Sequence, residues 1–300
     1  MKTCNECRAK DAKQSKKPTV RARKNDLQRE KRYYVAYREK KRAEDEDGFL
    51  AHNAKMAKIW RDSNMEHLAK WKTLNLCYRI TAIKQQARKK SIPWDLAMTD
   101  EYCKTLMEGP CAYCVQPVTT GLHGIDRMNN NAAYTISNCV GCCKMCNFIK
   151  KCLDPTTFIE RCQHISFRHG DVGALSPDSW MTSHSVSFGA YASRAAVKCL
   201  AFELSVADFA ALVSGACHYC QRSTGHGHTN GVDRKVNNIG YSRDNCVTCC
   251  CECNHAKGGL NDIEFIEHCK VIARVWEGKV TPFTGIPRIL RVVSKRTMVA

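Results

Sequence analysis

The sequence contains two copies of one cysteine-rich unit, and this internal repeat limits the possible folds more than any other feature. Each copy has two Cys-x-x-Cys pairs, separated by a Gly-x-Asp-Arg stretch, a tyrosine and an Asn-Cys-Val stretch. The first repeat carries the pairs Cys111/Cys114 and Cys143/Cys146, and the second repeat carries Cys217/Cys220 and Cys250/Cys253. The sequence therefore predicts two small, similar folded units in tandem.

The spacing of these cysteines predicts one zinc site in each repeat. Four thiolates bind zinc tetrahedrally, and a gap of two residues lets one turn present two sulfurs to the same ion. Cys142, Cys249 and Cys251 lie beside the second pairs, and the alignment of the repeats, not chemistry, favours Cys143 and Cys250 as the ligands. Sites of four cysteines are closed, so zinc is expected to hold the fold and not to catalyse. Buried free thiols and an iron–sulfur cluster are the alternatives.

The high cysteine content also indicates the cellular environment. The chain has 21 cysteines, an odd number, and its N-terminus lacks the apolar core of a signal peptide. A disulfide scaffold is disfavoured, and a reducing compartment is expected, namely the nucleus, the cytoplasm or the interior of a virion. No window approaches the roughly 18 apolar residues of a membrane span, so no membrane partner is predicted.

The remaining cysteines divide into a half-site and core positions. Cys4 and Cys7 form half of a third zinc site, which Cys77 or another chain would complete. The others precede valine in a strand-like run or fall in apolar helical patterns, and are predicted to be core residues. These are Cys103, Cys139, Cys152, Cys162, Cys199, Cys246 and Cys269.

The positive charge is concentrated in the first third of the chain. Over the whole sequence, 47 Lys and Arg against 29 Asp and Glu give a formal net charge of +18, which predicts a polyanionic partner or a solvated surface. Tyr33, Tyr34 and Tyr37 alternate with basic residues, a pattern that suits contact with nucleic acid, either DNA or RNA. The predicted contacts are Lys31, Arg32, Arg38, Lys40, Lys41 and Arg42. Alternatively, this is an exposed charged helix whose tyrosines pack on a neighbour.

The predicted fold class is α+β, with two zinc-stabilised repeats after a mainly helical basic region. Helix starts are expected at Thr99, Asp154, Ser205 and Asn261, and a stripe that includes Leu50, Trp60 and Trp71 is predicted to be core. The predicted segments are a basic arm with a Cys-x-x-Cys pair (1–25), a helical basic region (26–77), the first repeat (78–168), a linker rich in Ser and Gly (169–190), the second repeat (191–278) and a basic tail (279–300).

The residues between the cysteine pairs resemble the zinc-bearing HNH endonucleases, in the variant with Gly-x-Asp-Arg and Asn-Cys-Val stretches found in phages and giant DNA viruses. The resemblance covers roughly residues 88–165 and 194–275. It implies a ββα-metal element between the two cysteine pairs, in which a hairpin carries the general base and the next helix supplies a ligand for magnesium or manganese.

The resemblance implies roles for the matching residues. Asp126 and Asp233 would ligate the divalent cation. Asn147 and Asn254 match the ligand position on the helix, and Asn138 and Asn245 match the central asparagine that orders the loop and orients the base. Lys150 and Lys257 close the motif and are predicted to contact nucleic acid.

The histidine expected after the aspartate is replaced in both repeats, by Arg127 and Arg234. Arginine stays protonated in proteins and cannot act as a general base, although it can clamp a phosphate. It could instead form a structural ion pair with the aspartate. His123 is the candidate for a substitute base, against the alternative of a solvated loop histidine.

Three hypotheses follow for the function. The first is a DNA endonuclease that depends on magnesium or manganese. The second is a catalytically inactive relative that binds or packages DNA, and the third is a virion assembly protein. The missing histidine separates the first from the others, and the oligomeric state is open.

Overall fold

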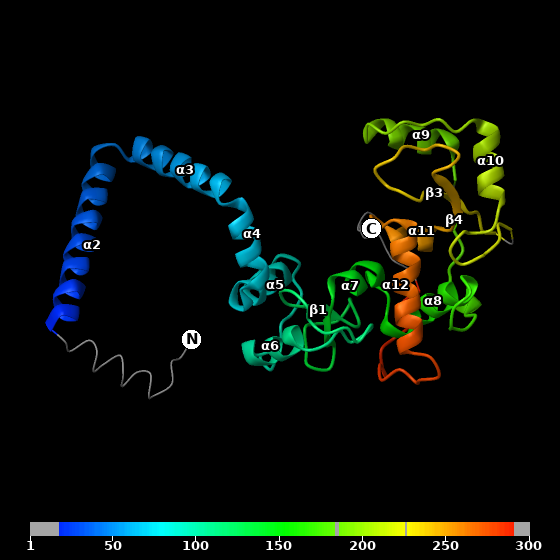
Figure 1. The fold of residues 1–300 in the computed structure, drawn as a ribbon, viewed down its shortest axis with the longest axis horizontal. Coiled ribbons are helices and arrows are strands. Elements are labelled where there is room, and N and C mark those ends of the chain that lie inside the picture. Colours follow the sequence, from blue (N-terminus) through cyan, green and yellow to red (C-terminus); the bar gives the residue numbers. More distant parts are fainter. Residues whose placement is uncertain (1–17, 184–185, 226, 291–300) are drawn as a thin grey trace. The chain divides into compact units, whose positions relative to one another are not determined.

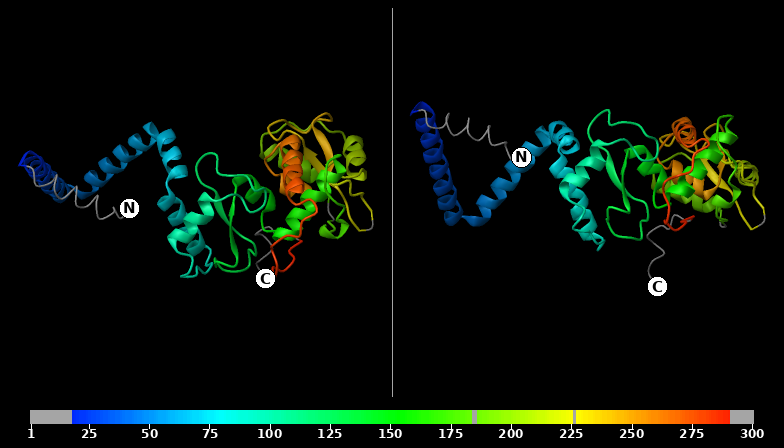
Figure 2. Two further views of the ribbon diagram at one scale, coloured as in Figure 1. Left: turned by 60° about the horizontal axis from the view of Figure 1, so that its bottom comes forward. Right: turned by 90° about the horizontal axis from the view of Figure 1, so that it is seen from below.

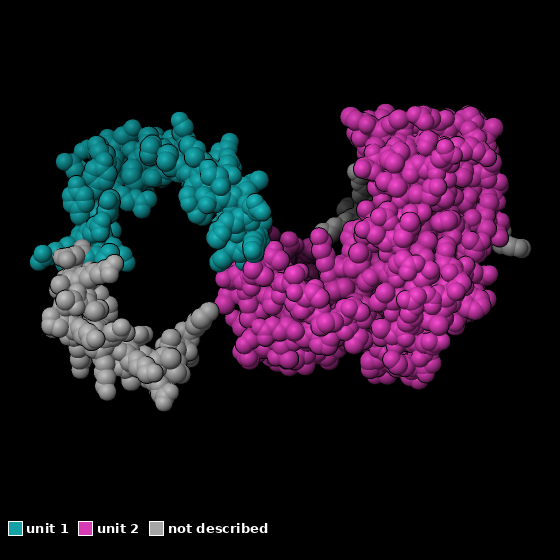
Figure 3. Space-filling model, viewed as in Figure 1, with its two compact units in different colours: residues 1–71 teal, residues 72–300 magenta. Residues whose placement is uncertain are grey.

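The computed structural model describes residues 18–183, 186–225 and 227–290. The chain divides into two compact parts, an N-terminal part of residues 1–71 and a C-terminal part of residues 72–300 (Figure 3). The predicted Cys4/Cys7 half-site lies outside the described residues. Both cysteine repeats belong to the C-terminal part, and each part is considered by itself below.

The N-terminal part is built from helices α2 (Pro18–Glu44), α3 (Glu46–Ser63) and most of α4 (Met65–Leu74). Asp45 begins α3, and its side chain accepts a hydrogen bond from the backbone N–H of Gly48. Every described side chain here is at least partly exposed. Leu50 is 50% exposed and Trp60 is 55% exposed, so the predicted core stripe is wrong. The stripe stays exposed because a pair of charged helices has too little apolar surface to enclose an interior.

The C-terminal part consists of two repeats with the same order of elements, helix–helix–hairpin–helix–helix. The first repeat comprises α5 (Leu76–Lys89), α6 (Asp100–Glu108), β1 (Gly124–Arg127), β2 (Cys139–Cys142), α7 (Lys144–Lys150) and α8 (Pro155–Arg168). The second comprises α9 (Phe188–Val197), α10 (Val206–Ser214), β3 (Gly231–Arg234), β4 (Cys246–Cys249), α11 (Cys251–Lys257) and α12 (Asp262–Val275). The predicted α+β class and its tandem ββα units are confirmed.

Each hairpin is antiparallel, and the two hairpins have the same register. Asp126 lies opposite Val140, and Asp233 lies opposite Val247. The two hairpins can be followed in Figure 2, the first in green and the second in yellow to orange. The matching register gives both aspartates the same position relative to the helix that follows the hairpin.

The helix starts follow the capping rules that the sequence indicates. Thr99 caps α6, Asp154 caps α8, Ser205 caps α10 and Asn261 caps α12, each by accepting a backbone N–H bond within the first turn. The Ser205 and Asn261 caps are complete capping boxes. Such a cap is worth about 1 kcal/mol, so these positions fix where each helix begins.

The repeat is longer than the cysteine pattern indicates. The first helix of each repeat, α5 or α9, lies ahead of the recognisable motif, and an equivalent bridge follows in each, between Trp94 and Tyr134 and between Phe202 and Tyr241. Helix α9 begins inside the segment predicted as a linker. That segment also contains a short 3₁₀ helix (Pro177–Ser179) and the buried Trp180, so much of it is packed.

The two repeats share one hydrophobic core. Helices α8 and α12 pack against each other (Figure 1). Their buried apolar residues and both cysteine clusters join one core, which includes Phe158, Ile159 and Cys162 of α8 and Phe265, Cys269 and Ile272 of α12. The repeats are therefore halves of a single packed body and not independent domains.

The described part of the predicted basic tail is packed against the first repeat. The Phe283 ring lies 5.5 Å from the Tyr113 ring and 5.7 Å from the Trp276 ring, measured between centroids. The backbone N–H of Ile289 donates to Asp154 at 2.7 Å. The segment is thus held to the core at Phe283 and to the start of α8 at Ile289. No described helix is long and apolar enough to cross a membrane.

The cysteines outside the clusters are expected to differ in their reactivity to alkylation, because they differ in burial. Burial raises the pKa of Cys139 and Cys246 to about 12, so at pH 8 almost none of either thiol is the reactive thiolate. Cys199 is exposed, which contradicts its predicted core position, because it lies just beyond the end of α9. We expect iodoacetamide to label Cys199 within minutes and Cys139 and Cys246 only after denaturation, as measured by peptide mass spectrometry. Equal labelling of all three in the native protein would contradict this.

Candidate metal centres and basic pockets

The eight predicted zinc ligands form two clusters of four thiols, one in each repeat. In each cluster all sulfur atoms lie within 4.8 Å of one another. The Cys114 and Cys143 sulfurs are 3.8 Å apart, as are those of Cys220 and Cys250. A tetrahedral zinc site with Zn–S bonds of 2.3 Å requires sulfurs about 3.8 Å apart. Both clusters therefore fit a structural zinc ion.

The geometry also settles which neighbouring cysteines belong to the clusters. The Cys142 thiol points to the carbonyl of Cys143 at 3.4 Å, and the Cys249 thiol points to the carbonyl of Cys250 at 3.2 Å. Cys251 is exposed. Cys143 and Cys250 are instead the N-caps of α7 and α11, where their sulfurs accept backbone N–H bonds. A helix N-terminus favours the thiolate, which is the form that binds zinc.

The aspartate at the matching position of each hairpin is buried, and its carboxylate is already paired. Asp126 accepts hydrogen bonds from the Tyr113 hydroxyl at 2.6 Å and forms an ion pair with Lys150 at 3.0 Å. Burial raises the pKa of the Asp126 carboxyl, and the lysine and tyrosine oppose that rise. In the second repeat, Asp233 accepts a hydrogen bond from the Tyr219 hydroxyl at 2.7 Å and forms an ion pair with Lys257 at 3.1 Å.

The two lysines are therefore internal residues. Lys150 and Lys257 are 0% exposed, and each ammonium group also donates to the carbonyl of the arginine that follows the aspartate. Their predicted contact with nucleic acid does not agree with this burial, because no atom of either side chain reaches the surface. The ion-pair partner of the aspartate is also the lysine, and not the arginine that the sequence suggested.

Arg127 and Arg234 each contact the loop between the strands of their own hairpin. Each guanidinium lies 4.9 Å from the ring centre of a tyrosine in that loop, Tyr134 or Tyr241. Arg127 donates to the carbonyl of Ala132 at 2.5 Å, and Arg234 donates to that of Ile239 at 3.0 Å. These contacts give both arginines a structural role within their own repeat.

The central asparagines order the same loops. The Asn138 side chain accepts from the backbone N–H of Asn129 and donates to the carbonyls of Asn129 and Ala133. Asn245 makes the equivalent bonds in the second repeat, to Val236 and Gly240. Both asparagines are buried. A side chain that satisfies three backbone groups in this way fixes the shape of a loop that has no regular structure.

Each repeat has a pocket at the junction of its hairpin and the following helix. The first pocket has a volume of about 750 Å³ and is lined by Gly124, Cys142 and Asn147, among others. The second, of about 460 Å³, is lined by the equivalent residues, which are Gly231, Cys249 and Asn254. The two asparagines that match the helix ligand position of the resemblance therefore do face the pockets.

The pockets are cationic. Arg79, Lys144 and Lys151 line the first pocket, and Lys151 and Arg194 line the second, beside His255, whose pKa is lowered by burial so that the neutral imidazole is favoured. Among the described residues, neither lining includes an Asp or a Glu. Such surroundings favour an anion over a cation. His123 is not among the lining residues, and its ring nitrogen Nε2 lies 3.1 Å from the carbonyl oxygen of Gln116.

The contact between α7 and α11 brings the two pockets together at Lys151. The Phe148 ring of α7 lies against Gly258, where a Cβ atom would come within 2.8 Å of the ring. Gly258 also has a φ of 54°, which glycine adopts without strain. The Lys151 ammonium lies 3.6 Å from the centre of the Phe148 ring. The sequence does not predict that Phe148, Lys151 and Gly258 meet, because they converge only when the repeats pack together.

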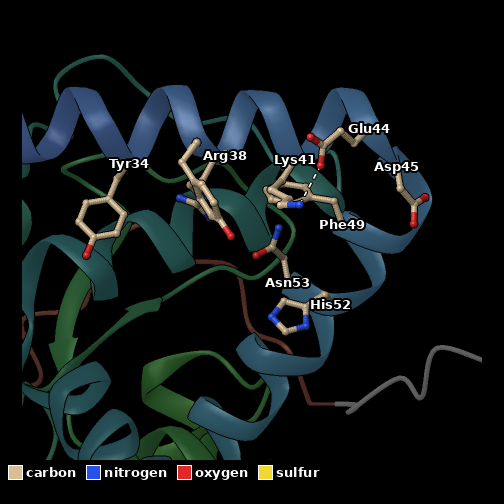
Figure 4. Close-up of a pocket in the computed structure, with 9 residues that line it drawn as sticks. Tyr34, Arg38, Lys41, Glu44, Asp45, Phe49, His52 and Asn53 are labelled. Carbon is tan, nitrogen blue, oxygen red and sulfur yellow. Dashed lines mark hydrogen bonds and ion pairs between the residues drawn. The ribbon is translucent and has the colours of Figure 1, made fainter.

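The N-terminal part has a separate cleft of about 680 Å³ between α2 and α3. Figure 4 shows Tyr34, Arg38 and Lys41 of α2 facing α3 across this cleft. Lys41 forms an ion pair with Glu44, and Arg42 forms one with Glu46. The other predicted contacts, Lys31, Arg32 and Lys40, are exposed and do not line the cleft. That all six contact nucleic acid stays a prediction.

Comparison with known proteins gives little direct information on function. No family model matches the chain. The chain is 32% identical over 246 residues to an uncharacterized protein, R423, of Acanthamoeba polyphaga mimivirus, and the match covers 79% of this chain and 45% of that protein. The chain thus spans less than half the length of this relative. One solved structure, of the rare-cutting HNH restriction endonuclease PacI, matches 35% of this chain and 91% of its own at 21% identity, with a TM-score of 0.25. A score this low carries no argument, and the assignments above rest on the chain's own geometry.

Proposed function

We propose that this protein is a zinc-stabilised nucleic-acid-binding protein that holds the phosphate backbone of DNA in its two equivalent basic pockets. The observation that carries the proposal is the pairing of the pockets around Lys151, which lines both. A phosphate needs cationic or N–H donors and no neighbouring carboxylate, and both linings meet this requirement. The proposal retains the nucleic-acid partner that the charge of the chain predicts.

The electrostatics of the pockets support binding of several phosphates at once. Arg79, Lys144, Lys151 and Arg194 are all at least partly exposed, so their charged groups are available to a ligand. The basic residues of α2 and of the N-terminal arm would add contacts through the same chain. Linked binding segments raise the overall affinity without any new contact at each one.

Metal-dependent hydrolysis is less well supported by the residues that face the pockets. A divalent cation such as magnesium prefers carboxylate oxygens, and the candidate ligands Asp126 and Asp233 are buried and paired with lysine. Neither aspartate is among the residues that line these two pockets. The donor set therefore does not fit the cation that the resemblance implies. Endonuclease activity is the second candidate function, and the observation that favours it is the presence of Asn147 and Asn254 in the pockets.

Replacing Lys151 by alanine is expected to weaken DNA binding more than any other single change in the pockets, because this side chain serves both. Fluorescence anisotropy with a labelled duplex, repeated at several salt concentrations, measures the effect. Each lost phosphate contact should reduce the slope of log K against log salt by about 0.9. We expect Arg79→Ala and Arg194→Ala to act on one pocket each and to have smaller effects.

Lys89→Ala is the matched control, because Lys89 is exposed at the opposite end of α5 from Arg79. Equal affinity and equal salt slope for Lys151→Ala, Lys89→Ala and the wild type would overturn the proposed site. Incubation with supercoiled plasmid and magnesium or manganese tests the second candidate function. Nicking that disappears in Asn147→Ala/Asn254→Ala would establish an endonuclease in place of a binding protein.

A further inference from the structure

The last helix of each repeat contacts the zinc cluster of the other repeat. Helix α12 of the second repeat brings His268 to the first cluster, where its ring nitrogen Nε2 lies 3.1 Å from the sulfur of Cys146. Helix α8 of the first repeat brings Arg161 to the second cluster, where it borders a small apolar cavity together with Cys253. His268 and Arg161 occupy matching positions in the two repeats.

Contacts between the repeats also reach the backbone of the first cysteine pair in each repeat. Trp276, just after α12, donates its indole N–H to the carbonyl of Tyr113 at 2.8 Å. His169, just after α8, has its Nε2 3.2 Å from the carbonyl of Tyr219. Tyr113 and Tyr219 each lie between the two cysteines of a first pair. The turn formed by each first cysteine pair therefore contacts a side chain from the other repeat.

The contact of His268 is chemically suited to a zinc-bound thiolate. Four thiolates around one Zn²⁺ leave the cluster with two negative charges, and hydrogen-bond donors to the sulfurs stabilise this charge. A coordinated sulfur has only lone pairs to offer, so the imidazole N–H is the donor in this pair. Groups that support metal ligands in this way typically change metal affinity by about 10–100-fold.

We propose that the two zinc sites are a coupled pair, in which each repeat completes the support of the zinc site in the other and His268 is a positioning residue for the first site. This goes beyond DNA binding, because it concerns how the protein holds its metal. Arg161 has the corresponding place in the first repeat, where its buried guanidinium lies 4.8 Å from the centre of the Trp180 ring and donates to the carbonyls of Ser179 and Leu290. Loss of zinc from one site is expected to loosen the other.

The test uses full-length protein loaded with cadmium, whose ¹¹³Cd resonance reports the environment of each site separately. Couplings to the cysteine β-protons assign the two resonances. His268→Ala should shift the resonance of the first site and leave that of the second in place. In competition with a chelator, the first site of the variant should bind zinc with an affinity about 10–100-fold lower than in the wild type. His268→Gln, which keeps an N–H donor, should restore part of both effects.

His67→Ala is the control, since His67 is an exposed histidine on α4. If His268→Ala lowers zinc affinity without shifting the ¹¹³Cd resonance of the first site, or if His268→Gln restores nothing, His268 only stabilises the fold and the positioning role is overturned. The variant Cys250→Ser/Cys253→Ser tests the coupling, because it removes the second site. Faster release or complete loss of zinc from the first site supports the coupling, and an unchanged release rate overturns it.

Discussion

Removal of zinc with a strong chelator is expected to unfold the whole C-terminal part in one transition. Structural zinc contributes apparent free energies of about 10–16 kcal/mol in zinc-finger peptides at neutral pH, and a typical domain is stable by only about 5–15 kcal/mol in total. Both cysteine clusters lie in the core that α8 and α12 share, so neither half can lose its ion and keep its interior. Far-ultraviolet circular dichroism and limited trypsin digestion, with and without chelator, measure the loss.

The readout must distinguish the two parts of the chain. Trypsin fragments that cover residues 72–290 should disappear when zinc is removed and return when zinc is added back. Magnesium is the control addition, because a cluster of four thiols does not bind it. A C-terminal part that resists trypsin equally with and without zinc would contradict the structural role of the clusters.

Replacing Lys150 by methionine is expected to destabilise the protein by about 3–5 kcal/mol, because the change leaves the buried Asp126 carboxylate without its partner. Lys257→Met should have a similar effect in the second repeat, where Asp233 is paired in the same way. Urea denaturation of the zinc-loaded protein, followed by circular dichroism, gives the change in the free energy of unfolding.

Two further variants make this measurement specific. Lys144 lies on α7, the helix of Lys150, but is exposed. We expect Lys144→Met to change the free energy of unfolding by less than about 0.5 kcal/mol. Lys150→Met/Asp126→Leu removes both charges and should recover much of the loss, since a buried pair can be replaced by apolar groups at little cost. Equal stability of Lys150→Met and Lys144→Met would show that the pair contributes nothing.

The role of the aspartates affects how activity experiments are interpreted. Asp126→Ala or Asp233→Ala would leave a buried lysine charge unpaired and is expected to lower stability, whether or not the protein has any enzymatic activity. Loss of function in such variants therefore does not identify a catalytic residue. Substitutions of the pocket residues Asn147 and Asn254 test catalysis without disturbing the buried ion pairs.

The sequence was sufficient to predict the parts of the fold that depend on local patterns. Cysteine spacing predicted both clusters, because four ligands to one ion leave few choices of geometry. The four helix starts followed from the N-cap residues Thr99, Asp154, Ser205 and Asn261. These features depend on residues a few positions apart, so a single sequence is enough to find them.

The features that the sequence missed depend on contacts between distant segments. Helix α9 is not predicted from local patterns, because it follows a stretch rich in Ser and Gly and bears little resemblance to α5 in sequence. The sequence does not predict the burial of Lys150, because a lysine is almost always exposed and only its ion pair with Asp126 in the fold explains the exception. The sequence does not predict the basic pockets either, because Lys151 lines both of them only through the contact of α7 with α11.

The reciprocal packing of α8 and α12 makes this single chain equivalent to a dimer whose two subunits can never separate on dilution. A dimer of separate subunits dissociates when its concentration falls below its dissociation constant, whereas here the partner is always attached. The covalent link also frees the two halves from having identical sequences. They have already diverged at the pockets, where Lys144 and Phe148 of one half correspond to Cys251 and His255 of the other. The two halves can therefore specialise for different sections of an asymmetric ligand while keeping one common interior.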